Sequence, residues 1–202
     1  MKPLTALLFI TATLVAAQNC PPEATVNDPA TNAWTGKLLD ALAAEQSCSA
    51  ANTDATFAST SACNIFVGRV LKTLYGVDDF VVQPPQAGKV YYTANEISAL
   101  LPSWSAWSDL GTADNQDVLN MAKAQADQQH LVIAVWSNSD GPGHVALVGP
   151  GPLKHSPKWG LDTPVSASFA LNQPAKAFLG QPLACAFNKD IKGDVHLWVK
   201  TR

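Results

Sequence analysis

The sequence predicts an α+β fold in which helical segments come first and an antiparallel sheet follows. One observation is the helical spacing of apolar residues in several segments before residue 128. Another is a pair of apolar runs, Leu131–Trp136 and His144–Val148, joined by a turn rich in Asn, Asp, Gly and Pro. The length of 202 residues suits one domain. We therefore expect a single domain whose sheet lies in the second half of the chain.

The composition excludes several classes of protein. Apolar residues make up 47% of the chain and charged residues 14%, so the chain can bury a core and is not intrinsically disordered. The 13 basic residues are outnumbered by 16 acidic residues, which gives a formal charge of −3. Nucleic-acid binding needs an excess of positive charge to neutralise phosphates. We therefore expect no nucleic-acid partner.

The N-terminus has the pattern of a secretory signal peptide, residues 1–17. Lys2 supplies a positive charge, Leu7–Val15 forms an apolar segment, and Ala17 ends a region of small residues that suits cleavage. The apolar segment is shorter than the ~20 residues that cross a bilayer. We expect cleavage near Ala17, a single mature domain of residues 18–202, secretion to the periplasm or the extracellular space, and no membrane anchor.

Residues 62–75 form the best-defined predicted helix. Ser61 can cap its N-terminus, and Gly76 suits the position just after its C-terminus. One face of the helix is apolar along its whole length, and Cys63 is the first residue of that face. The apolar face consists of Cys63, Phe66, Val67, Val70, Leu71 and Leu74. We expect this helix to pack at the centre of the domain.

The other elements follow from spacing and capping signals. Helices are predicted at 31–47 and 115–128, and a capping box at 93–96 opens a third, short helix. Alternating apolar residues predict a strand at 194–201, and 163–169 is a candidate strand that could pair beside the strand of His144. The residues expected to face inward on the helix at 115–128 are Val118, Leu119, Ala122 and Ala126.

The cysteines do not have equivalent surroundings. In a secreted protein Cys20, Cys48, Cys63 and Cys185 would form two disulfides by default. Cys63 differs because it lies in the first turn of a helix, where unpaired backbone N–H groups and the helix dipole stabilise a thiolate. A thiolate in that position can act as a nucleophile. We therefore expect Cys63 to stay unbridged and Cys185 to pair with Cys20 or Cys48.

One of the four histidines is placed to act as a base. His130 follows a helix, His155 lies in a polar loop, and His196 alternates with apolar residues of the last strand. His144 instead begins a buried strand directly after Gly143, where a rigid backbone can hold an exposed side chain. We expect His144 to approach Cys63 once the chain has folded.

These residues resemble the papain-like cysteine peptidases that cut bacterial cell-wall peptides, including the CHAP and NlpC-type amidases. The segments that carry the resemblance are Ser61–Val67, Leu131–Trp136 and Gly143–Gly151. The first class of type VI secretion amidase effectors is the most similar group, although those effectors usually lack a cleaved signal peptide. The resemblance covers roughly residues 53–160. It implies a papain-like, NlpC-type core, with an N-terminal helical part and a central antiparallel sheet.

The resemblance also implies an activity: hydrolysis of an amide in the peptidoglycan stem peptide, between D-glutamate and the meso-diamino acid. Cys63 would form a thioacyl intermediate, and His144 would protonate the leaving amine and then activate water. A third polar group often orients the histidine, and Asp162 is the first candidate, with His155 and Asn172 as alternatives. The implied partner is bacterial peptidoglycan. A protein inhibitor is left open, and we expect a monomer.

A second hypothesis is a secreted, disulfide-stapled binding module that is not an enzyme. It would recognise a glycan or a protein through tryptophans predicted in loops or on a polar strand face, namely Trp104, Trp107, Trp159 and Trp198. Such a module would have Cys63 oxidised, whereas an amidase would leave it as a thiol. No His-x-His, His-Glu-x-x-His or Cys-x-x-Cys spacing occurs, so we expect no metal and no other cofactor.

Overall fold

The computed structural model describes residues 62–87, 89–169 and 177–200. The predicted signal peptide at 1–17 and the predicted helix at 31–47 lie outside the described residues, as do Cys20, Cys48 and Asn172. The described part contains helices and a mostly antiparallel sheet, which confirms the α+β class.

Within the described part, six strands form the central sheet, and each strand is antiparallel to its neighbours. Their order across the sheet is β3-β10-β4-β5-β8-β9. The strands are β3 (Trp107–Thr112), β4 (Leu131–Trp136), β5 (His144–Val148), β8 (Val165–Ser168), β9 (Phe178–Pro182) and β10 (His196–Lys200). The last strand described, β10, lies between β3 and β4, so a C-terminal segment forms an inner strand of the sheet.

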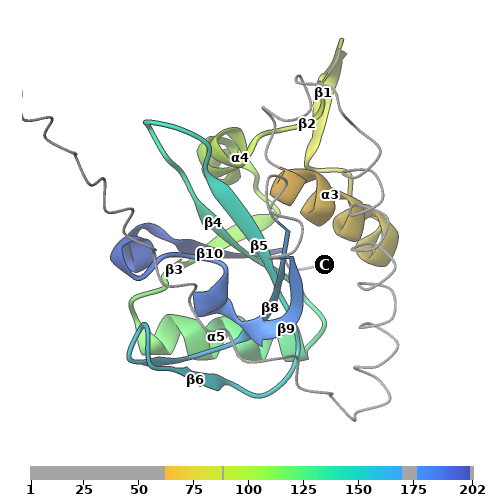
Figure 1. Ribbon diagram of the computed structural model, residues 1–202. Coiled ribbons are helices and arrows are strands. Elements are labelled where there is room, and N and C mark those ends of the chain that lie inside the picture. Colours follow the sequence, from red (N-terminus) through yellow and green to blue (C-terminus); the bar gives the residue numbers. More distant parts are fainter. Residues whose placement is uncertain (1–61, 88, 170–176, 201–202) are drawn as a thin grey trace, which may run out of the picture.

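Helices cover both faces of this sheet (Figure 1). Helices α3 (Ala62–Tyr75) and α4 (Ala94–Leu100) lie on one face, and α5 (Gln116–Asp127) lies on the other. Two small hairpins lie outside the sheet, β1 (Val81–Gln86) with β2 (Lys89–Tyr91) and β6 (Lys154–Ser156) with β7 (Leu161–Thr163). The 3-10 helices are η1 (Leu101–Ser103), η3 (Leu183–Cys185) and η4 (Lys189–Asp194).

The sheet separates two hydrophobic cores. The α3-side core includes Cys63, Phe66, Val67, Val70, Leu71, Ile97, Ile133, Val135, Val145, Leu147, Phe169 and Trp198. The α5-side core includes Val118, Leu119, Ala122, Val132, Ala134, Ala146, Val148, Trp159, Phe187, Val195 and Leu197. Because both faces of β4 and β5 are covered, these strands are apolar at successive positions and do not alternate with polar residues.

The predictions made from local patterns are confirmed. Helix α3 has the predicted bounds, and the capping box that opens α4 is formed between Thr93 and Glu96. Asn115 caps α5, whose four predicted inward residues are all buried. Strands β4 and β5 have the predicted bounds and pair as a hairpin. The candidate strand at 163–169 contains β8, which pairs beside β5.

Other predictions are wrong because they depend on how the sheet is assembled. The helices do not all precede the sheet, since β3 comes before α5 along the chain and joins the sheet through β10. Trp198 was expected on a polar face, yet it is 8% exposed and packs in the α3-side core. Trp159 is likewise buried, in the α5-side core. Neither tryptophan can therefore line a surface groove.

Candidate functional site

Cys63 is a buried, unbridged cysteine in the first turn of α3. Its neighbours Phe66 and Val67 are also fully buried, so the first turn is held inside the α3-side core. Cys185 is disulfide-bonded, and its partner lies outside the described residues, where Cys20 and Cys48 are. The expectation that Cys63 is unbridged is therefore confirmed.

The start of α3 is fixed from two directions. The buried Asn64 donates from Nδ2 to the carbonyl oxygen of Tyr92 at 2.6 Å, which ties the first turn to the segment after β2. On its other side the helix packs against β5 and β8, and the rings of Phe66 and Phe169 lie 6.3 Å apart. The position of Cys63 is thus set by rigid elements, as a reactive group requires.

His144 is the first residue of β5 and lies opposite Trp136 of β4. Its Nε2 is 2.8 Å from Oγ of Ser168 on β8, and its ring meets that of Phe187 edge-on at 5.2 Å. Burial disfavours the charged imidazolium and lowers the pKa of His144 from 6.5 to about 4. The imidazole is therefore neutral at neutral pH, which is the form that can accept a proton.

The side chain of Asn95 holds the loop before His144. Asn95 of α4 donates from Nδ2 to the carbonyl oxygens of Asn138 and Gly141, both at 3.0 Å, and accepts from the backbone N–H of Asn138 at 2.9 Å. A Cβ on Gly143 would lie 2.5 Å from the carbonyl oxygen of Trp136 and would also collide with Oδ1 of Asn95. A glycine is therefore required where the loop passes close to α4.

Helix α3 packs against β5, but the side chains of Cys63 and His144 point to different sides of the sheet. Strand side chains alternate between the faces of a sheet. Val145 and Leu147 pack in the α3-side core with Cys63, whereas Ala146 packs in the α5-side core. His144 is two residues before Ala146 and so lies on the same face of β5, where its ring contacts Phe187 of the α5-side core. The His144 ring thus faces the α5 side of the sheet and Cys63 lies on the α3 side, so the pairing of the two groups stays a prediction that this arrangement does not favour.

Asp162 does not occupy the position predicted for a group that orients His144. It lies on β7, more than half exposed, and its carboxylate is 2.9 Å from Nδ1 of His155. Its backbone is bonded to the side chain of Gln116 on α5. Ser168 is the residue bonded to the His144 ring. The structure thus places Ser168, and neither Asp162 nor His155, at hydrogen-bond distance from the His144 ring.

Sequence reasoning missed Ser168 and Asn95. Ser168 belongs to the segment Val165-Ser-Ala-Ser168, in which serines alternate with small apolar residues as they would on one strand face. That alternation could have indicated a polar strip on the α5 side of the sheet. Asn95 was read only as part of a capping box. Its role in the loop depends on how α4 packs on β4, which no local pattern reveals.

No three His, Cys, Asp or Glu side chains within 62–87, 89–169 and 177–200 are grouped so that they could hold a metal ion. No helix in the same ranges is both long and apolar enough to cross a membrane.

Comparison with known proteins adds no assignment. Neither the protein-family models nor the curated protein sequences contain a match to this chain.

We predict that Gly143→Ala destabilises the protein by about 1–3 kcal/mol, because the added methyl group would force the loop away from Trp136 and Asn95. Urea unfolding at pH 7 measures the change. Gly141→Ala is the matched control, since its Cβ would meet only the movable side chain of Asn138, at 3.1 Å. Equal stability of the two variants would contradict the close approach at Gly143.

We also predict that the free energy of unfolding falls as the pH drops from about 6.5 to about 4. In that range the unfolded chain binds a proton on His144 and the folded chain does not, so protonation favours unfolding. His144 is half-buried, and we expect a loss of about 1–3 kcal/mol after allowing for its solvent contact.

The check is urea unfolding at pH 7 and at pH 4.5, on the parent and on His144→Gln, whose side chain can hydrogen-bond but does not titrate. Acid should destabilise the variant less than the parent. An identical loss in both proteins would show that His144 is not the group responsible.

Proposed function

We propose that the protein is a secreted cysteine amidase with a papain-like core, and that it hydrolyses an amide bond in the stem peptide of bacterial peptidoglycan. The observation that carries the proposal is an unbridged thiol in the first turn of α3, on a helix packed against the strand that begins with His144. A helix first turn favours the thiolate through its free N–H groups and its dipole.

The neutral His144 ring suits the role of base. If the Nε2 proton is donated to Ser168, Nδ1 is left with a lone pair that can take the proton of the Cys63 thiol. The sulfur then attacks the amide carbonyl carbon, and the protonated His144 gives its proton to the leaving nitrogen as the C–N bond breaks. His144 next takes a proton from water, which attacks the thioester and releases a carboxylic acid and the thiol.

This mechanism requires the sulfur of Cys63 to meet the His144 ring at the end of the sheet. In the structure the His144 ring is bonded to Ser168 and meets Phe187 of the α5-side core, so this step requires the ring to turn from the α5 side of the sheet toward the layer of α3. Backbone N–H groups at the start of α3 could stabilise the oxyanion that forms during attack. The choice of substrate comes from the resemblance of the Cys63 and His144 segments to cell-wall amidases.

A binding module in which every cysteine is bridged fits the thiol less well. That hypothesis expects Cys63 to be oxidised, and it is unbridged. It also expects four tryptophans in a groove, and three of them, Trp107, Trp159 and Trp198, are buried in the cores. Both observations favour the enzyme.

We predict that Cys63→Ala and His144→Ala each abolish the release of soluble fragments from Gram-negative peptidoglycan, because each removes a group that takes part in bond cleavage. Ser168→Ala should slow release by about tenfold, the effect of one lost orienting hydrogen bond. Asp162→Ala is the matched control and should keep the parent rate, since Asp162 is bonded to His155.

Release is followed by chromatography of the soluble fragments, and mass spectrometry of the products identifies the bond cut. Thermal melting shows whether each variant is folded. Parent-like release by Cys63→Ala would end the proposal. A larger effect of Asp162→Ala than of Ser168→Ala would restore Asp162 as the orienting residue.

A further inference from the structure

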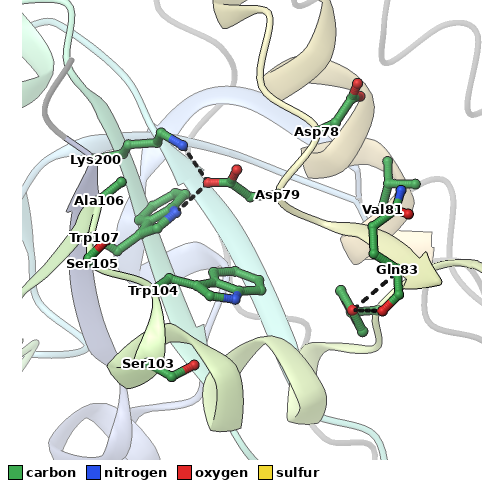
Figure 2. Close-up of a pocket in the computed structure, with 11 residues that line it drawn as sticks. Asp78, Asp79, Val81, Gln83, Ser103, Trp104, Ser105, Ala106, Trp107 and Lys200 are labelled. Carbon is green, nitrogen blue, oxygen red and sulfur yellow. Dashed lines mark hydrogen bonds and ion pairs between the residues drawn. The ribbon is translucent and has the colours of Figure 1, made fainter.

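A second site lies outside the Cys63 and His144 region. It is a pocket of about 550 Å³ between the base of β1 and the segment that joins η1 to β3. Its lining includes Asp78, Asp79, Gln83, Trp104, Trp107 and Lys200. Figure 2 shows the indole of Trp104 in the middle of these side chains, with Asp79 and Lys200 above it in the view. The volume is that of an ordinary small-ligand site.

The charges of this pocket are already compensated. The carboxylate of Asp79 lies 2.5 Å from Nζ of Lys200 and accepts a hydrogen bond at 2.7 Å from Nε1 of Trp107. Asp78 is 3.1 Å from Nζ of Lys72, which lies just outside the pocket. Since each carboxylate has an ammonium partner, no net charge is left to select an ionic ligand. A neutral ligand that carries many hydrogen-bonding groups fits better.

The aromatic wall of the pocket offers an apolar surface beside these compensated charges. Trp104 is half-buried, and it is supported from behind by Phe80 and Tyr92, whose ring centroids are 6.1 and 6.2 Å from its own. A supported indole gives a rigid apolar surface at little cost in entropy. The exposed Gln83 and Ser103 lie at the rim and offer an amide and a hydroxyl. A flat apolar surface ringed by neutral and compensated polar groups suits a sugar ring, which has an apolar C–H face and hydroxyls at its edge.

We propose that this pocket binds a saccharide of the N-acetylhexosamine class. Its aromatic surface would receive the C–H face and the acetyl methyl group, and its polar rim would bind the hydroxyls. Given the proposed function, on which this step rests, the saccharide is part of the glycan strand that carries the stem peptide.

The pocket is linked structurally to the first turn of α3. Tyr92 lines the pocket, and its carbonyl oxygen accepts the hydrogen bond from Asn64, the residue after Cys63. Its hydroxyl is also bonded to the backbone of Gln83, 3.1 Å from the amide nitrogen. A glycan held on Trp104 would therefore be positioned by the same segment that fixes the proposed nucleophile.

The test is isothermal titration calorimetry of the full mature protein with the β-1,4-linked tetramer of N-acetylglucosamine. It uses the Cys63→Ala background, so that no cleavage can occur. We expect saturable binding that changes less than twofold between 0.05 and 0.5 M salt (roughly), because no net charge is involved. Trp104→Ala should weaken binding at least about tenfold, the effect of losing a large aromatic contact.

Gln83→Ala is the second variant, because its exposed side chain can be removed without disturbing the core, and it should weaken binding about threefold, as loss of one hydrogen bond does. Met121→Ala is the control: Met121 is 45% exposed on α5, on the other face of the sheet, and the variant should bind as its parent does.

No binding of the tetramer, or equal binding by Trp104→Ala when that variant is folded, would overturn the proposal. So would saturable binding of free diaminopimelic acid without binding of the sugar, since that ligand is ionic. Sugar binding by a parent protein that releases no peptidoglycan fragments would support the pocket and count only against the amidase. Fragment release without sugar binding would support the amidase and count only against the saccharide pocket.

Discussion

The packing of α3 against β5 is the constraint on which the rest of the site depends. It buries Cys63 in the α3-side core, whereas the ring of His144, at the start of β5, contacts Phe187 of the α5-side core. Both groups are then fixed by regular elements, and the loop between β4 and β5 is held in turn by Asn95. Few residues around the proposed site are therefore free to move, and a pre-organised nucleophile requires such rigidity.

The electrostatics of His144 set the kind of chemistry that this arrangement can perform. Its partner is the neutral hydroxyl of Ser168 and not a carboxylate, and burial lowers the pKa of the ring to about 4. His144 is thus neutral at neutral pH. The imidazolium that forms during catalysis would have to be stabilised by the thiolate itself, because a buried charge needs a partner.

Local sequence patterns predicted the helices and strands, whereas the partners of the site residues depend on long-range strand pairing. The apolar face of α3, the capping box of α4 and the apolar runs of β4 and β5 each lie within a few turns of chain, and all are confirmed. Ser168 could not be chosen over Asp162, because the choice depends on which strand pairs beside β5 and in which register. Trp198 was misplaced for a similar reason, since β10 lies inside the sheet with both faces covered.

The central claim is that Cys63 and His144 act as one unit, and the pH dependence of Cys63 alkylation tests it most directly. Iodoacetamide should label the thiol of the folded parent at pH 6 to 7 (roughly), below the ordinary thiol pKa of ~8.5, and His144→Gln should slow that labelling at least about tenfold. Identical pH profiles for the parent and His144→Gln, or a thiol that does not react in the folded protein, would contradict the account.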